Sequence, residues 1–254
     1  MEQETKFIAI SNQKGGVGKS AFTSLFASYL HYEKNKIVVV IDCDYPQYSI
    51  HNMRESDIET IGRNKDLQLS LQRLYENTGK KAYKIICTAP ENALNKTLEY
   101  IDQLPVSPDI VLFDLPGTVN SAGVLNLLFN MDYVFVPIIP DKRVLHSSLA
   151  FVMSTRQYMA DNDFKGSLKD IYFFWNRIDK RENTELCDIF NDMIKEEGLK
   201  ILTTVIPDTK KYNKELSLNR NTAFRSTLFP PDKRMMRNTN LEALINEVSD
   251  IIEL

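Results

Sequence analysis

The stretch Ser11-Asn12-Gln13-Lys14-Gly15-Gly16-Val17-Gly18-Lys19-Ser20 joins two segments of different periodicity. The apolar run Lys6–Ile10 before it predicts a buried strand, and the apolar spacing of residues 21–32 predicts a helix. A glycine-rich turn between a strand and a helix is typical of a phosphate-binding loop, because glycines let successive backbone N–H groups point toward one anion. In such a loop Lys19 reaches the β- and γ-phosphates, and the Ser20 hydroxyl binds Mg²⁺.

Further strands and helices alternate along the rest of the chain. Strands are predicted over residues 6–10, 37–41, 83–87, 110–113, 133–137, 171–175 and 201–206. Helices are predicted over residues 21–32, 49–82, 91–104, 121–129, 141–161, 182–197 and 241–252. This alternation predicts an α/β fold, a mostly parallel sheet of about seven strands flanked by helices. No linker or repeat interrupts the pattern, so residues 1–254 are expected to form a single domain; residues 208–238 are irregular, basic and contain proline.

Composition narrows the class of protein further. The chain has 254 residues, 43% of them apolar, which is enough for a sizeable core, and its net charge of −3 gives no global signal for nucleic acid. Cys43, Cys87 and Cys187 are scattered and form no C-x-x-C pair, as expected for reduced thiols. The polar start predicts no signal peptide, and no apolar run approaches the roughly 18–20 residues of a membrane span. We therefore expect a cytoplasmic protein that does not enter the membrane.

Acidic residues follow two of the predicted strands. Asp114 ends the run Ile110-Val111-Leu112-Phe113, which is the pattern of an acid that holds Mg²⁺ through water. Asp42 and Asp44 end the run of residues 37–41 and would point the same way if the strand continued. They either simply terminate the strand or position an attacking water. Gly117 would let its loop contact the γ-phosphate and change with hydrolysis. Ligands of open α/β sheets bind at the carboxyl ends of the strands. The two acidic strand ends and the strand that leads into the glycine-rich loop therefore predict one site.

The general phosphate-loop pattern fails at Gln13, and an additional lysine, Lys14, precedes the glycines. The stretch Lys14–Ser20 thus resembles the deviant Walker A motif of the ParA/MinD family, P-loop NTPases of the SIMIBI class. The resemblance implies an ATPase that uses ATP and Mg²⁺ and closes into a homodimer when ATP binds. Lys14 would reach across that dimer to the partner's phosphates, as an arginine finger does. The nucleotide-binding residues implied in the loop are Lys14, Gly15, Gly16, Val17, Gly18, Lys19, Ser20 and Ala21.

The same resemblance assigns roles to the acidic residues. Asp-x-Asp after the second strand is similar to an acidic motif of ParA-type ATPases, in which the second Asp organises the attacking water. This implies a catalytic role for Asp44, beside Lys14 and Lys19, and places Asp42 near the Mg²⁺ shell with Ser20 and Asp114. Family members usually continue with Pro-Gln directly, whereas Tyr45 intervenes here.

Two later stretches are expected to contact the base. Asn176-Arg177-Ile178-Asp179 resembles the Asn-Lys-x-Asp motif of GTPases, with Arg in place of Lys. ParA-like proteins also place base contacts in this region, so Asn176 would read a base edge in either case. The deviant loop is the more specific signal and favours adenine. Pro207-Asp208 is similar to the family's second base-contacting loop, which acts mostly through its backbone.

Three further stretches resemble one branch of the family. They are residues 114–121 (DLPGTVNS), 206–210 (IPDTK) and 224–230 (FRSTLFP). They look like the ParA-type ATPases of Bacteroides conjugative transposons, known as conjugal transfer protein TraA. This resemblance implies a role in the partition, maintenance or transfer of mobile DNA.

Three other branches of the family have sequence features that this chain does not share or that have a simpler explanation here. The helix predicted at residues 241–252 carries only acidic charges, so core packing is expected rather than binding to anionic lipid as in MinD-like proteins. Cys87 is the nearest candidate for the cluster cysteines of nitrogenase-iron-protein relatives, but burial in a strand explains it equally well. The last tyrosine is Tyr212, so the C-terminal tyrosine cluster of the bacterial tyrosine kinases is missing.

A local excess of basic residues lies between Val205 and Asn238. This stretch contains eight basic and three acidic residues, which gives it a net charge of +5 on an acidic chain. This is either a solvated loop face or a surface for DNA phosphates. ParA relatives bind DNA nonspecifically as ATP dimers, which favours DNA. The candidate contacts are Lys210, Lys211, Lys214, Arg220, Lys233 and Arg234, whereas Arg225 lies among apolar residues and is a candidate for a structural role.

Three functions remain open from the sequence. The first is an ATP-dependent switch that binds DNA and hydrolyses ATP slowly, stimulated by a protein activator such as a ParB-like or conjugation protein. The second is a nucleotide switch that binds a protein of the conjugation or partition machinery without DNA. The third is a metabolic P-loop enzyme, which would work as a monomer and would not need Lys14.

Overall fold

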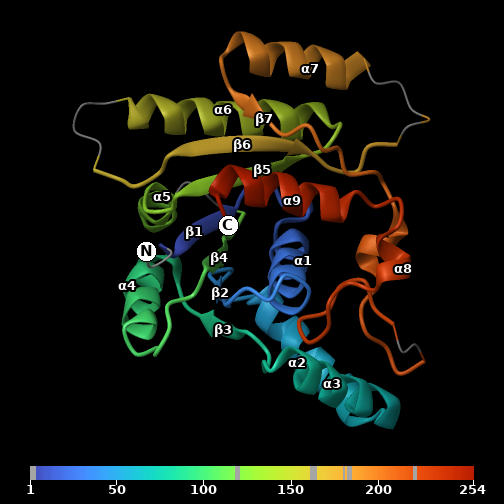
Figure 1. Ribbon diagram of the computed structural model, residues 1–254. Helices are drawn as coiled ribbons and strands as arrows, with labels where there is room; N and C mark the ends of the chain where they lie inside the picture. Colours follow the sequence, from blue (N-terminus) through green and yellow to red (C-terminus); the bar gives the residue numbers. More distant parts are fainter. Residues whose placement is uncertain (1–3, 118–120, 161–164, 180, 182–184, 220–221) are drawn as a thin grey trace.

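The computed structural model describes residues 4–117, 121–160, 165–179, 181, 185–219 and 222–254 (Figure 1). Within them, seven strands form one sheet in the order β3-β2-β4-β1-β5-β6-β7, and every neighbouring pair is parallel. The strands are β1 (Lys6–Ile10), β2 (Val38–Asp42), β3 (Lys84–Cys87), β4 (Ile110–Asp114), β5 (Tyr133–Ile138), β6 (Asp170–Trp175) and β7 (Lys200–Ile201). The helices are α1 (Lys19–Tyr32), α2 (Ser49–Gly62), α3 (Lys65–Thr78), α4 (Pro90–Ile101), α5 (Ala122–Phe129), α6 (Lys142–Met159), α7 (Glu185–Glu196), α8 (Lys233–Met236) and α9 (Leu241–Ile252), with a 3₁₀ turn η1 (Lys210–Asn213).

Helices cover both faces of the sheet, which confirms the predicted α/β class. One core cluster joins the sheet to residues of α4, α5, α6 and α7, and a second joins its other face to α1 and α9. The central strands β2 and β4 are buried along their whole length. A parallel strand covered on both faces needs such continuous apolar runs, which is why the sequence pattern located the central strands. In Figure 1, α2 and α3 leave the body of the sheet beside its β3 edge.

The last helix packs in the core, as expected for an amphipathic helix whose charges are all acidic. Leu241, Leu244, Ile245, Val248 and Ile252 are all buried in α9. No helix in the described part of the chain is long and apolar enough to cross a membrane.

The predicted seventh strand over residues 201–206 is wrong in its length, because β7 consists only of Lys200–Ile201. The backbone N–H groups of Thr203 and Thr204 donate to the carboxylate of Glu247 at 2.6 and 2.9 Å. This carboxylate on α9 therefore takes the place of a sheet partner for two residues. The chain rejoins the sheet at Pro207, which forms an isolated parallel bridge with Ile178.

The long polar segment predicted as helical over residues 49–82 forms two helices. Asn64 separates them: its side chain accepts hydrogen bonds from the backbone N–H groups of Asp66 and Leu67 at 3.0 and 3.1 Å. This is an N-cap, which satisfies donors at the start of α3. The break allows α3 to turn back beside α2.

A buried polar network fixes the irregular segment that follows residue 222. Asp57 on α2 is 2% exposed and accepts hydrogen bonds from the Thr227 N–H at 2.7 Å, the Thr227 hydroxyl at 2.8 Å and the Ser226 hydroxyl at 3.0 Å. Arg54, one turn earlier, donates to Thr227 and to the carbonyl oxygen of Tyr83. On the other side, the Ser28 hydroxyl of α1 donates to the carbonyl oxygen of Ser226 at 2.5 Å. The segment is thus held between α1 and α2.

Replacing Asp57 with alanine tests this network. The change leaves three donors without an acceptor in a buried site, so we expect the free energy of unfolding to fall by about 3 kcal/mol. Glu55→Ala, at an exposed position of the same helix, is the matched control and should change stability by less than about 0.5 kcal/mol. Chemical denaturation followed by circular dichroism measures both; equal stability of the two variants would contradict the structural role of Asp57.

Candidate functional site

The glycine-rich loop between β1 and α1 has the backbone that the sequence predicts. Gly16 and Gly18 have φ values of +76° and +100°, which are unfavourable for residues with a side chain. A Cβ at Gly18 would also lie 3.1 Å from both the amide nitrogen of Asn176 and the ring of Phe22. Gly18 is therefore required twice, by its backbone conformation and by the close approach of its neighbours.

Buried Asn12 anchors this loop to the rest of the sheet. Its side-chain nitrogen donates to the carbonyl oxygen of Pro137 and to the Ser148 hydroxyl, both at 2.8 Å. Its side-chain oxygen accepts the backbone N–H of Lys14 at 3.0 Å. Asn12 therefore ties the position of Lys14 to β5 and α6, a role that the sequence analysis missed.

The two lysines of the loop have different environments. Lys14 is exposed, whereas Lys19 is turned inward and its Nζ donates to the carbonyl oxygen of Lys14 at 3.1 Å. Burial lowers the pKa of Lys19, and the nearby carboxylates of Asp114 and Asp44 partly oppose this shift. Gly117 lies close to this side chain, because a Cβ at Gly117 would be 3.6 Å from the Nζ of Lys19. Lys19 thus occupies the base of the loop and leaves Lys14 on the surface.

Strand register brings two acidic residues together below the loop. Asp114 pairs in register with Ile10 on β1 and with Asp42 on β2, and both carboxylates are fully buried. Asp42 accepts the N–H groups of Ile50 and His51 at 2.9 and 3.0 Å, so it caps the first turn of α2. By hydrogen-bond geometry neither oxygen of Asp114 has a partner among the described residues, although the nearby Ser20 hydroxyl opposes the rise of its pKa. Burial is the main reason that the pKa of Asp114 rises to about 8.

Asp42 and Asp44 do not extend from one continued strand, since β2 ends at Asp42. Asp44 is half-buried, accepts a hydrogen bond from the Ser49 hydroxyl at 3.2 Å and faces the cleft described next. Asp42 therefore supports α2, whereas Asp44 lines the cleft.

A cleft of about 450 Å³ opens above the loop. Its wall includes most of the residues proposed for nucleotide binding, namely Gly15, Gly16, Gly18, Lys19, Ser20, Ala21, Asn176, Pro207 and Asp208. Lys14, Val17, Asp42 and Asp114 are not part of the wall. The wall also includes residues that the sequence analysis did not place there: Phe22, Arg177, Thr209, Tyr212, Asn213 and Arg225.

The two predicted base-contacting stretches lie together at this cleft. Ile178 bridges Pro207, and the Asp208 N–H donates to the carbonyl oxygen of Ile178 at 3.0 Å. The side-chain nitrogen of Asn176 donates to the carbonyl oxygen of Val17 at 2.9 Å. Asn176 thereby joins this wall of the cleft to the glycine-rich loop.

The described basic residues that were predicted to contact DNA lie in and near η1 and α8. Lys210 and Lys211 lie in η1, and Lys211 donates to the carbonyl oxygen of Arg237 at 2.5 Å, which links η1 to the end of α8. Lys233 is exposed and pairs with Glu33 at 3.0 Å. The remaining residues of that set are Lys214, half-buried after η1, Arg234, exposed on α8, and Arg220, which lies outside the described residues.

A comparison with known protein families shows where the chain belongs. A model of the CobQ/CobB/MinD/ParA nucleotide-binding domain matches residues 8–222, and the chain belongs to this family. A search of curated proteins found no significant match.

Solved structures of several relatives share the fold. A plasmid partition protein from Borrelia burgdorferi bound to AMPPNP is 22% identical, with a TM-score of 0.58 over 85% of this chain and 92% of that one. The MinC:MinD cell division complex of Aquifex aeolicus is similar at 17% identity and a TM-score of 0.60, over 98% and 96% of the chains. Cobyrinic acid a,c-diamide synthase from Mycobacterium smegmatis, with an ATP analogue and magnesium, shows 22% identity and a TM-score of 0.52 over 82% and 86%.

Asp114→Asn tests the electrostatics of the buried acid. Because its pKa is raised, the folded chain keeps a proton on Asp114 that the unfolded chain has lost above about pH 4, so stability falls as pH rises toward 8. Without nucleotide or metal, Asp114→Asn is therefore expected to be more stable than wild type at pH 8. The advantage should grow from pH 5 to pH 8, by at most about 1.4 kcal/mol per pH unit.

Thermal and urea unfolding at pH 5, 6.5 and 8 in EDTA measure this difference. Asp102→Asn, at an exposed position, is the control for the loss of one carboxylate. A stability difference between Asp114→Asn and wild type that is the same at all three pH values would contradict the raised pKa.

Proposed function

We propose that the chain is a Mg²⁺- and ATP-dependent dimerising ATPase switch of the ParA/MinD type. The observation that carries the proposal is Lys14, an exposed additional lysine in a phosphate loop whose other lysine, Lys19, already lines the cleft. A metabolic P-loop enzyme that works as a monomer would not need this exposed lysine outside its own cleft. The Bacteroides TraA-like branch, with a role in partition, maintenance or conjugal transfer of mobile DNA, is part of this proposal.

The donor set below the loop suits a hard divalent cation. Asp114 offers two buried carboxylate oxygens without protein partners, and the Ser20 hydroxyl lies in the cleft wall nearby. Oxygen ligands of this kind, completed by waters and phosphate, are what Mg²⁺ prefers. Asp42, the carboxylate beside Asp114 on the neighbouring strand, would support the metal site. The ion, when bound, neutralises charge that develops on the transferred phosphoryl group.

The remaining residues divide the work of hydrolysis. Backbone N–H groups of the loop and the Lys19 ammonium hold the phosphates. Asp44 faces the cleft and would orient the attacking water, since phosphoryl transfer depends mainly on positioning and charge stabilisation. Lys14 would supply a further positive charge to the partner's nucleotide. With its catalytic cation arriving only in the dimer, the monomer would hydrolyse ATP slowly.

Adenine is the base that the site favours. In a GTPase-type motif the aspartate corresponding to Asp179 reads guanine, but here Asp179 pairs with Arg181 at 2.6 Å and is not part of the cleft wall. Asn176, Pro207 and Asp208 remain as base contacts. The ligands of the Borrelia and Mycobacterium structures, AMPPNP and an ATP analogue with magnesium, support ATP and Mg²⁺.

Lys14→Ala is expected to separate nucleotide binding from dimer formation. Because Lys14 is exposed and outside the cleft wall, the variant should bind ATP within about threefold of wild type, yet its ATP-dependent dimer should weaken at least tenfold, a loss of about 1.4 kcal/mol. Calorimetry and analytical ultracentrifugation with ATP, ADP or no nucleotide measure the two properties.

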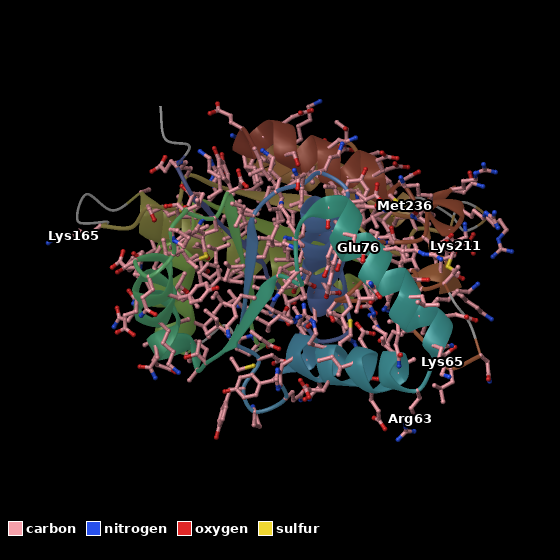
Figure 2. All side chains as sticks on the ribbon, turned by 60° about the horizontal axis from the view of Figure 1, so that its bottom comes forward. Arg63, Lys65, Glu76, Lys165, Lys211 and Met236 are labelled. Carbon is pink, nitrogen blue, oxygen red and sulfur yellow. The ribbon has the colours of Figure 1, made fainter. Side chains whose placement is uncertain are left out.

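Two control variants accompany Lys14→Ala. Lys165→Ala removes an exposed lysine at the far end of the molecule from Lys211 (Figure 2) and should behave as wild type. Lys19→Ala should lose ATP binding itself. A Lys14→Ala protein that dimerises with ATP as wild type does would overturn the proposed role in the partner's site.

The surface proposed for DNA surrounds η1 and α8. Figure 2 shows Lys211 and Met236 at one edge of the molecule, with Arg63 and Lys65 of the α2–α3 turn in the same view. Exposed lysines and arginines on one side are suited to nonspecific phosphate contacts. The neighbouring plasmid partition protein supports a DNA-related role, whereas the MinC:MinD complex shows that this fold also serves protein partners. A ParB-like or conjugation protein is the activator that we propose.

Reversing the charges of Lys210, Lys211 and Lys214 to glutamate tests DNA binding. We expect the ATP-bound dimer to bind any duplex, and the triple variant to lose at least tenfold in affinity at low salt. The slope of log K against log salt should fall by about 1 for each lysine that contacts phosphate. Fluorescence anisotropy at two or more salt concentrations measures both, with thermal unfolding as the check on folding.

The matched control reverses Lys96, Lys165 and Lys195, three exposed lysines outside this surface, which changes the net charge equally. Equal losses in both triple variants would indicate a general charge effect. An ATP-dependent dimer that ignores DNA would leave the switch and favour the alternative, a protein partner of the conjugation machinery.

A further inference from the structure

Arg225 lies in the wall of the cleft, although its neighbours in the sequence are apolar and suggest a structural role. Its side chain is 20% exposed and pairs through Nη2 with Glu215. The other guanidinium nitrogens have no hydrogen-bond partner among the described residues, and Nε is buried. A buried guanidinium N–H without an acceptor is costly, so a ligand in the cleft that offers one would be favoured.

The backbone on both sides of Arg225 is fixed, so the guanidinium is held in place. The N–H groups of Phe224 and Arg225 both donate to the carbonyl oxygen of Lys214, at 2.9 and 3.0 Å. Phe224 is fully buried and its ring contacts that of Tyr212, with centroids 5.0 Å apart. On the other side, Ser226 is bound by Asp57. Positioning of this kind is what a binding residue requires, because little freedom is lost when the ligand arrives.

The location of Arg225 selects one half of a nucleotide. The phosphate end of the cleft is formed by the glycine-rich loop and Lys19. Arg225 lies instead beside η1, because its backbone N–H binds the carbonyl oxygen of Lys214 and the ring of the preceding Phe224 contacts Tyr212. This turn directly follows Pro207 and Asp208, the proposed base contacts, which line the same cleft. The acceptors at that end of a bound nucleotide are the ring nitrogens of the base and the ribose hydroxyls.

We propose that Arg225 binds the nucleoside half of the nucleotide, with Glu215 holding its guanidinium in orientation. The proposal rests on the nucleotide binding proposed above. It assigns a function to the segment of residues 222–229 beyond packing, and it links nucleotide affinity to the η1 region, where Lys210 and Lys211 lie.

The test compares ATP with tripolyphosphate, which has the phosphates but no base or sugar. Arg225→Gln is expected to weaken ATP binding 10- to 100-fold while tripolyphosphate affinity changes less than twofold, as measured by isothermal titration calorimetry with Mg²⁺. Arg225→Lys keeps the charge and the aliphatic stem but lacks the planar fork of donors, so it should still lose about fivefold or more. Glu215→Gln should lose two- to fivefold for ATP alone. Arg73→Gln, at an exposed position of α3, is the matched control and should bind both ligands as wild type does.

The outcomes distinguish this inference from the proposed function. Wild-type affinity for ATP in both Arg225 variants would overturn the inference alone. Equal losses for ATP and tripolyphosphate, with unchanged melting temperature, would place Arg225 at the phosphates and overturn the nucleoside assignment. Should Arg225→Gln lower the melting temperature, the stable Arg225→Lys and Glu215→Gln variants decide by the same comparison. Wild-type protein that binds neither ATP nor GTP would overturn the proposed function and this inference with it.

Discussion

The parallel pairing of β4 between β1 and β2 is the constraint on which the candidate site depends. It sets Asp114 in register with Ile10, which leads into the glycine-rich loop, and with Asp42 at the end of β2. Since parallel strands end at the same edge of a sheet, the loop and both carboxylates meet without any long excursion of the chain. The arrangement is costly: burial raises the pKa values of Asp42 and Asp114 and lowers that of Lys19. A fold that keeps ionisable groups in such surroundings is suited to a ligand that completes their coordination.

Most of the sheet and the position and backbone of the glycine-rich loop could be predicted from the sequence, because their signals are local. Central strands such as β4 need continuous apolar runs, and the loop needs glycines at positions with positive φ, here Gly16 and Gly18. The buried face of α9 follows from its helical spacing in the same way. Each of these features is determined within a window of about a dozen residues, so no knowledge of distant contacts was needed.

Apart from the break at Asn64, which is a local N-cap, the features that escaped prediction depend on contacts between distant residues. Glu247 shortens β7 by binding amides 43 and 44 residues earlier in the chain. Asn12 positions Lys14 through Ser148, 136 residues away. Arg225 reaches the cleft because Asp57 binds the residues that follow it. A single carboxylate, amide or guanidinium carries no periodicity, and its partner cannot be identified before the fold is known.

Helix α2 shows how these distant contacts converge on one element. Asp42, proposed to support the metal site, caps its first turn through the N–H groups of Ile50 and His51. Two turns later, Asp57 binds Ser226 and Thr227, next to Arg225 in the wall of the cleft. Asp42 on β2 and the segment that carries Arg225 are therefore both bound to the same helix. Since a helix is rigid over this length, α2 fixes the distance between the residues that bind Asp42 at its first turn and Asp57, which binds the segment after Arg225.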